Sequence, residues 1–211
     1  VFASIMSIFS IFSGNFYVIF SYPLALLGFI DDIKSLSRIK RFLIQLLVVS
    51  FLIFFSFINR DFIYLIGLRF VFILLIPMII IFTGLINFIN FMDGIDGLVA
   101  GCMLTIFTFY YLIIDPSFVY LLPVLSAFLI FNWNPSKLFM GDSGSTFLGL
   151  LLFYITFSNN NLNSSIIALS TASPLLLDSL VCILRRAYNK ENIFSPHKKH
   201  LYQRLHQKGM Q

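Results

Sequence analysis

Charge is scarce in this chain. Asp, Glu, Lys and Arg make up 11% of its 211 residues, whereas hydrophobic residues make up 59%. A soluble domain cannot bury that share of apolar side chains, so the composition indicates a membrane protein with several spans. The net charge of +5 comes without a basic patch interleaved with aromatic residues, which argues against a nucleic-acid partner.

Cysteine is almost absent as well. Cys102 and Cys182 both lie inside apolar runs, so we expect apolar filler rather than a disulfide, metal or redox site. An initiator Met and a cleavable signal peptide are also missing, since the chain opens at Val1 within an apolar segment. We therefore expect a chain that is incomplete at its N-terminus.

Long apolar runs dominate what is present. They fall at 1–12, 16–30, 42–58, 70–90, 98–114, 117–131, 145–158 and 166–184. A membrane-spanning helix needs about 20 mainly apolar residues, which most of these runs reach together with their flanks. The predicted fold class is all-α, a polytopic transmembrane helix bundle of about eight spans. One catalytic membrane domain would cover 1–186, and 187–211 would be its basic cytoplasmic His-containing segment.

The Lys and Arg residues assign the loops to sides of the membrane. Counting spans alternately, one side receives Lys34, Arg38, Lys40, Arg41, Lys137, Arg185, Arg186, Lys190, Lys198, Lys199, Arg204 and Lys208. The opposite loops, 59–69, Asp115-Pro116 and 158–165, carry only Arg60 and Arg69. The basic side should be cytoplasmic, and it also holds every polar motif described below.

The first motif ends the fourth apolar run with Asn87, Asn90, Asp93 and Asp96. Such groups are costly at membrane depth and normally face a protein interior, a polar cavity or a ligand. The spacing of three places Asn87, Asn90 and Asp93 on one helical face, and Gly94 and Gly97 then weaken the helix. A polar helix end emerging into water is the alternative.

The second motif is Asp31-Asp32 at the end of the second run. Adjacent carboxylates repel, so holding both ionised requires a cation nearby. Mg²⁺ binds through one or two carboxylates plus substrate phosphates, which suits this pair. The alternative is an ordinary helix end that pairs with Lys34.

The third motif runs from Asn132 through Lys137 to a Gly-Asp-Ser-Gly-Ser sequence at 141–145. Its glycines predict a tight turn that carries Asp142, with the Ser143 and Ser145 hydroxyls and backbone N–H groups available to an anion. The spacing and terminal Lys of a Walker loop are missing. A plain Asx turn is the alternative.

The fourth motif contains His197, His200 and Arg204 in the basic tail. No Cys or third His completes a zinc set, so we expect phosphate binding; a solvated tail drawn to anionic lipid is the alternative. Asp178, inside the last run, has no basic residue three or four positions away and is a further site candidate. Together the motifs describe a Mg²⁺-dependent site for phosphates at a membrane surface.

In this combination and order, the motifs resemble the polyprenyl-phosphate N-acetylhexosamine-1-phosphate transferases, glycosyltransferase family 4, whose superfamily includes phospho-MurNAc-pentapeptide translocase. The resemblance rests on Asp31-Asp32 with Leu36-Ser37, Asn87-x-x-Asn90-x-x-Asp93-Gly-Ile-Asp96-Gly, Asn132-x-x-Pro135 through Gly141-Asp142, and His197-x-x-His200-Leu-Tyr-Gln-Arg204. It implies transfer of a sugar-1-phosphate from a UDP-sugar to undecaprenyl phosphate, with release of UMP.

The resemblance also implies roles for the residues. Asp142 would be the metal ligand for Mg²⁺, with Mn²⁺ as a substitute, and Asp31, Asp32, Asp93 and Asp96 would be catalytic. The substrate-binding set would be Asn87, Asn90, Asn132, Lys137, His197, His200 and Arg204. Expected partners are undecaprenyl phosphate, a UDP-N-acetylhexosamine, membrane lipid and a second copy in a homodimer, at the bacterial inner (plasma) membrane.

The sequence departs from the family pattern in three places. The N-terminal helices with their cytoplasmic loop and the final span after the His motif are absent, so an inactive fragment is an alternative. The tail reads His-Lys-Lys-His instead of consecutive His residues, which favours initiation of O-antigen or another surface polysaccharide with a GlcNAc, FucNAc or QuiNAc donor.

Other membrane protein classes fit the sequence less well. A Mg²⁺-dependent intramembrane prenyltransferase would need a second spaced Asp-x-x-x-Asp helix, and a CDP-alcohol phosphotransferase an Ala-Arg shortly after its Asp-Gly. A transporter would place ionisable residues near mid-membrane in several spans, whereas here they gather at one end.

Overall fold

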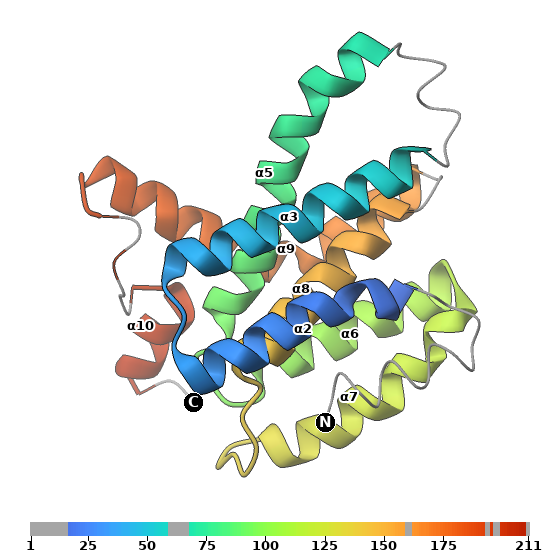
Figure 1. The fold of residues 1–211 in the computed structure, drawn as a ribbon. Coiled ribbons are helices and arrows are strands. Elements are labelled where there is room, and N and C mark those ends of the chain that lie inside the picture. The colour runs from blue at the N-terminus through green and yellow to red at the C-terminus, as the bar shows by residue number, and fades with distance from the viewer. Residues whose placement is uncertain (1–16, 59–67, 159–161, 193–194, 196–198, 210–211) are drawn as a thin grey trace.

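The computed structural model describes residues 17–58, 68–158, 162–192, 195 and 199–209, and all regular secondary structure within them is helical (Figure 1). The helices are α2 Tyr17–Lys34, α3 Arg38–Ile58, α5 Leu68–Met92, α6 Leu98–Ile113, the 3-10 helix η1 Pro116–Tyr120, α7 Leu121–Asn132, α8 Gly141–Ser158, α9 Leu162–Tyr188 and α10 Leu201–Gln207. The predicted all-α class is therefore confirmed for this part of the chain.

Helix α8 occupies the centre of the bundle. Its Phe147, Leu148, Leu150 and Leu151 are fully buried, and it packs against α2, α5 and α9. Buried side chains of α8 contribute to two hydrophobic clusters, a larger one with α6, α7 and α9 and a smaller one with α2, α3 and α5. Because close packing of side chains stabilises a helix bundle, α8 holds the two halves of the bundle together.

Two glycines allow neighbouring helices to approach α8 closely. A Cβ on Gly28 of α2 would lie 2.4 Å from the Ser143 Cα, and a Cβ on Gly149 would lie 3.0 Å from the Ile86 Cα of α5. Small residues at such positions let helix backbones pack against each other. The α2–α8 contact brings the end of α2, with Asp31 and Asp32, beside the start of α8.

The helix boundaries follow the predicted apolar runs, except that 1–12 lies outside the described residues. One prediction about the fourth run is wrong: α5 ends at Met92, so Asp93 is in the turn after the helix rather than on its face. The Asp93 N–H donates to the Asn90 carbonyl over 3.2 Å, a three-residue step that closes the last turn.

Apolar side chains also cover much of the outside of the bundle. Leu47 and Phe51 of α3 are 70% and 61% exposed, and Ile76 of α5 is 65% exposed. Among the described helices, Leu75–Met92 and Asn163–Tyr188 are long and apolar enough to cross a membrane, and Leu98–Ile113 and Phe118–Asn132 are shorter apolar helices.

Candidate active site

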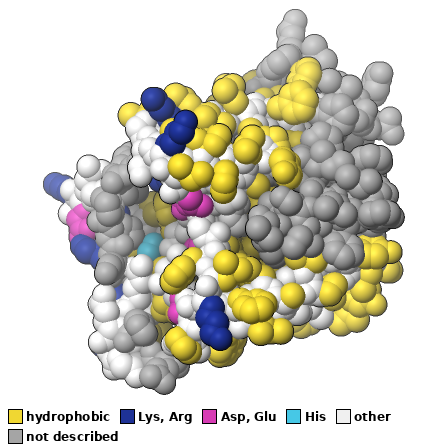
Figure 2. All heavy atoms as spheres, turned by 60° about the horizontal axis from the view of Figure 1, so that its bottom comes forward, with side chains coloured by type: hydrophobic (Ala, Val, Ile, Leu, Met, Phe, Trp, Pro, Cys, Tyr) yellow, Lys and Arg dark blue, Asp and Glu magenta, His cyan; other side chains and the backbone are white. Residues whose placement is uncertain are grey.

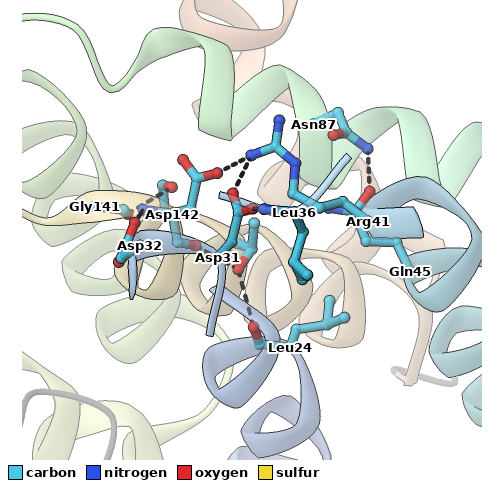
Figure 3. A network of polar contacts seen from close by, with 11 residues as sticks. Leu24, Asp31, Asp32, Leu36, Arg41, Gln45, Asn87, Gly141 and Asp142 are labelled. Atoms are coloured by element: carbon cyan, nitrogen blue, oxygen red, sulfur yellow. Dashed lines mark hydrogen bonds and ion pairs between the residues drawn. The ribbon is translucent and has the colours of Figure 1, made fainter. Parts of the chain in front are cut away.

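The site is built where the end of α2, the start of α3 and the start of α8 meet (Figure 3). Asp31 accepts a 2.6 Å hydrogen bond at Oδ1 from the Leu36 N–H, and its Oδ2 lies 2.7 Å from an Arg41 guanidinium nitrogen. The same nitrogen forms an ion pair with Asp142. One cation on α3 therefore joins two carboxylates that are 111 residues apart in the chain.

Asp32 points toward the start of α8 instead. Its Oδ1 accepts a hydrogen bond from the Asp142 backbone N–H over 3.3 Å. Gly141 has φ +64°, a conformation that favours glycine, and a Cβ there would lie 2.8 Å from the Asp32 Oδ2. The glycine before Asp142 is thus required by both the backbone and the neighbouring carboxylate.

Arg41, rather than Lys34, is the cation that pairs with Asp31, so the alternative of a local Lys34 pairing is wrong for the described structure. Asp31, Arg41 and Asp142 keep 10%, 30% and 27% of their side-chain surface exposed. The cluster is therefore partly desolvated but open to solvent on one side, as a site for a charged ligand must be.

The Gly-Asp-Ser-Gly-Ser sequence forms the first turn of α8 instead of a free turn. The Ser143 hydroxyl donates to the Ala25 carbonyl at 2.8 Å, and Ser145 is fully buried with its hydroxyl donating to the Gly141 carbonyl. The expectation that these hydroxyls are available to an anion is therefore wrong. They hold α2 and the first turn of α8 in place.

Asn87 reaches the same region from α5. Its amide nitrogen donates to the Gln45 Oε1 at 2.7 Å and to the Thr83 carbonyl at 2.8 Å. Gln45 is only 3% exposed and lies one helical turn after Arg41, so both residues lie on one face of α3. Sequence reasoning did not single out Gln45, although a Gln inside an apolar run is itself a signal of a buried polar contact.

Asp93 lies in the turn between α5 and α6, half-buried. Burial, followed by the negative charges of Asp142, Asp32 and Asp96, raises its pKa from 3.8 to about 7. Those interactions show that the turn and the α2–α8 junction share one acidic region. The predicted catalytic carboxylates Asp31, Asp32, Asp93 and Asp96 and the predicted ligand Asp142 are therefore brought together.

Two polar contacts connect this turn to the loop before α8. The Gly97 N–H donates to the Asn132 Oδ1 at 3.0 Å, and the Ser136 N–H donates to the Asp96 Oδ2 at 3.1 Å. Asn132 is 5% exposed, and its amide nitrogen donates to the Leu138 carbonyl. In this structure Asn132 joins two loops, and its substrate-binding role stays a prediction, as do those of the half-buried Asn90 and the exposed Lys137.

The C-terminal residues lie beside the ends of α5 and α9. His200 is buried, and its burial lowers its pKa below 6.5. Arg204 lines a cavity of about 250 Å³ together with Cys182, Arg185, Arg186, Asn189, Glu191 and Lys199. None of the clustered aspartates lines this cavity. His197 lies outside the described residues.

The Arg186 side chain organises the loop that leads to His200. It is 3% exposed and donates to the Ser195 Oγ at 2.7 Å, to the Asn192 carbonyl and to Glu191. Lys199 pairs with the same Glu191 at 2.6 Å. Arg186 was read from the sequence only as a topology signal, because its partners lie in a loop whose path the sequence does not show.

The face that carries the site is seen in Figure 2. Asp and Glu side chains reach the surface near its middle, Lys and Arg side chains lie around them, and hydrophobic side chains spread over the adjoining surface. Within the described residues, no three or more His, Cys, Asp or Glu side chains form a metal-binding group. Asp31 and Asp142 each direct one carboxylate oxygen to the same Arg41 nitrogen. Two carboxylates arranged in this way also fit a metal ion whose remaining ligands are phosphate oxygens.

Comparison with known proteins assigns the chain to a family. The model of glycosyl transferase family 4 matches residues 15–159, and the chain belongs to that family. It is 32% identical over 202 residues to a probable undecaprenyl-phosphate N-acetylglucosaminyl 1-phosphate transferase of Bacillus subtilis, covering 88% of the chain and 56% of that protein.

Two further relatives have related names. An undecaprenyl-phosphate alpha-N-acetylglucosaminyl 1-phosphate transferase of Thermotoga maritima is 33% identical over 89% of the chain and 60% of its own length. A phospho-N-acetylmuramoyl-pentapeptide-transferase of Staphylococcus haemolyticus is 30% identical over 87% of the chain and 63% of its own length. The chain thus spans about 60% of the length of these relatives.

Proposed function

We propose that this protein transfers an N-acetylhexosamine-1-phosphate from a UDP-sugar to undecaprenyl phosphate and releases UMP. The observation that carries the proposal is the convergence of Asp31, Asp32 and Asp142 with Arg41 beside the acidic turn at Asp93. The names of the relatives support the polyprenyl-phosphate acceptor, and two of them support GlcNAc as the first sugar to test, before FucNAc and QuiNAc.

In the proposed reaction, an oxygen of the lipid phosphate attacks the β-phosphorus of the UDP-sugar. The bond from that phosphorus to the bridging oxygen breaks, and the oxygen leaves with UMP. A phosphate monoester is already largely ionised near neutral pH, since its second pKa is about 6, so no general base is needed to start the attack. The protein's task is therefore to bring two anionic substrates together.

The described residues divide this task between them. Asp142, with Asp31 or Asp32, would hold Mg²⁺, which when bound neutralises charge that develops on the phosphate oxygens. Arg41 keeps the Asp31 and Asp142 carboxylates facing each other, and Gln45 fixes the Asn87 amide. Asp93 lies beside them, and its burial and acidic neighbours favour the protonated form of its carboxyl group. In that form the group would donate a hydrogen bond to the nucleotide.

We also infer that the bundle spans the bacterial inner membrane with this site on the cytoplasmic side. The exposed apolar side chains of α3 and α5 support this inference, because a soluble protein rarely exposes such large apolar surface. The product, a lipid-linked sugar, would then start O-antigen or another cell-surface polysaccharide.

The test uses the chain with any flanking segments that its gene encodes, in detergent with undecaprenyl phosphate and Mg²⁺. UMP release is followed from a panel of UDP-N-acetylhexosamines. We expect release with one donor, lost in EDTA, and lowered at least about 100-fold by Asp142→Asn. Asp115→Asn, which changes an aspartate at the other end of α6, is the matched control. No release from any donor, or full activity of Asp142→Asn, would sink the proposal.

A further inference from the structure

Asp178 is a carboxylate in the middle of α9, between the apolar residues Leu177 and Val181. Its side chain is only 11% exposed, and the cluster of aspartates and Arg41 described above does not include it. A carboxylate is costly in apolar surroundings unless it is hydrogen-bonded or paired. Its partners in this structure come from a segment more than 20 residues later in the chain.

Those partners lie at the start of α10. The Leu201 N–H donates to the Asp178 Oδ1 at 2.8 Å, whereas the His200 Nδ1 lies 3.7 Å from the Asp178 Oδ2, beyond hydrogen-bond distance. The first N–H groups of a helix have no partner inside the helix, so an outside carboxylate that accepts from one of them fixes the helix end. Gln203 adds a contact within the segment by accepting from the His200 N–H at 3.3 Å.

A second attachment joins the same segment to α5. The Tyr202 hydroxyl donates to the Phe91 carbonyl at 3.0 Å, and the Tyr202 and His200 rings stack with centroids 5.6 Å apart. A Cβ on Gly94 would lie 2.4 Å from the Tyr202 hydroxyl. Phe91 and Gly94 flank Asp93, so this attachment places α10 directly against the acidic turn.

The two attachments act on one small element from different helices. α10 has seven residues, too few for a helix to be stable without tertiary contacts. Burial raises the pKa of Tyr202 to about 12, and the nearby charges of Asp178 and Asp93 contribute to the same increase. The Tyr202 hydroxyl therefore stays a hydrogen-bond donor at any physiological pH.

We propose that Asp178 is a positioning residue that fixes the start of α10, and thereby holds His200 and Tyr202 against the turn that carries Asp93. The structural role of Asp178 can be tested without substrate, whereas its effect on KM rests on the proposed function. Under that function, His200 contributes to binding of the nucleotide sugar, and Asp178 acts on the substrate only through His200.

The experiment compares Asp178→Ala and Asp178→Asn with the unchanged protein in detergent. Hydrogen–deuterium exchange of the peptide covering 199–207 reports the attachment of α10 without any substrate. We expect exchange about tenfold faster in Asp178→Ala, and much less change in Asp178→Asn, because an amide oxygen still accepts from the Leu201 N–H. Tyr202→Phe removes the second attachment and should also speed exchange.

Steady-state kinetics then separate positioning from general damage. Asp178→Ala should raise KM for the UDP-sugar about tenfold with a smaller change in kcat, whereas loss of folded protein would lower kcat alone. Asp178→Asn should restore part of the affinity. Ser179→Ala is the matched control, since Ser179 is the next residue of α9 and its hydroxyl donates to the Phe88 carbonyl of α5.

Unchanged exchange of the 199–207 peptide in Asp178→Ala would overturn the proposal. Faster exchange with an unchanged KM would overturn the positioning role. Where Asp178→Ala does not fold, Asp178→Ser carries the same two measurements, because it keeps a polar group at this position but is too short to accept from the Leu201 N–H. An unchanged protein that releases no UMP from any donor contradicts the proposed function, while the exchange comparison still decides whether Asp178 fixes α10.

Discussion

At the scale of single residues, Asp93 is the aspartate of the acidic cluster outside the helices whose pKa is raised most by its surroundings. Its folded-state pKa of about 7 lies above 3.8, so between these values the folded protein binds more protons than the unfolded chain. Stability therefore falls as pH rises through this window, and the deficit is complete above about pH 7. An uncharged residue at this position escapes that penalty.

We predict that Asp93→Asn raises the thermal midpoint in detergent and EDTA more at about pH 8 than at about pH 5. The upper limit at the higher pH is about 4 kcal/mol, since one pKa unit corresponds to about 1.4 kcal/mol. The same variant should lose UMP release. Asp115→Asn should show no such pH-dependent gain. Equal gains for Asp93→Asn at both pH values would show that the carboxylate is not held in an acidic, buried turn.

The sequence identified Asp31, Asp32, Asp93 and Asp142 because carboxylates in an apolar chain stand out. It did not identify the partners that orient them. In the sequence, Arg41 is one of many basic residues that mark the cytoplasmic side. Its two ion pairs cannot be predicted there, because they depend on where α3 lies relative to α2 and α8. The prediction that Ser143 and Ser145 contact an anion is wrong, because their hydroxyls donate to carbonyls of α2 and α8. Only the helix packing shows these hydrogen bonds.

At the scale of elements, the contact of α2 with α8 sets the distance between the Asp31-Asp32 pair and Asp142. Gly28 lies in this contact, where a Cβ would meet backbone atoms of Ser143 and Asp142 at 2.4 to 2.5 Å. Backbone atoms cannot move aside as a flexible side chain can, so an added methyl group must separate the two helices.

We predict that Gly28→Ala destabilises the protein by about 1–3 kcal/mol, as overpacking commonly does, and lowers UMP release by more than about tenfold. Gly101→Ala in α6 is the control, because a Cβ there meets nothing within 4 Å. That variant should be neutral or slightly more stable, since Ala favours a helix over Gly by about 0.5–1 kcal/mol. Similar thermal midpoints and activities for both variants would contradict the role assigned to Gly28.

The positions of the elements were predictable because apolar runs between polar motifs have the length of helices. Their packing was not, since periodicity does not tell which helix faces which. The end of α5 shows the limit: the spacing of Asn87, Asn90 and Asp93 suits one helical face, yet Gly94 and Gly97 end the helix at Met92, and Gly97 adopts φ +76° before α6.

At the scale of the whole molecule, the basic residues predict that the site faces the cytoplasm. Lys40, at the start of α3, and Pro116, between α6 and α7, are both exposed and belong to opposite predicted sides. In a variant that carries Cys102→Ala and Cys182→Ala, a single introduced cysteine is the one thiol available for labelling. Its labelling then shows on which side of the membrane that position lies. Both native cysteines are free thiols, so the background removes them without breaking a disulfide.

We predict that a membrane-impermeant maleimide labels Pro116→Cys in intact spheroplasts and labels Lys40→Cys only after permeabilisation. Both variants should retain UMP release, which controls for correct insertion. Labelling of the two cysteines from the same side would contradict the alternating topology, and labelling of Lys40→Cys alone in intact cells would reverse it.

The placement of Arg41 and Gln45 on a single turn of α3 also matters for inhibition. Arg41 holds Asp31 and Asp142, and Gln45 holds Asn87, so one helix supports three groups of the site. A small apolar compound that lodges under α3 from the lipid phase would separate all three contacts at once. It would act by displacing the groups that position the substrates, instead of by occupying the place of a substrate.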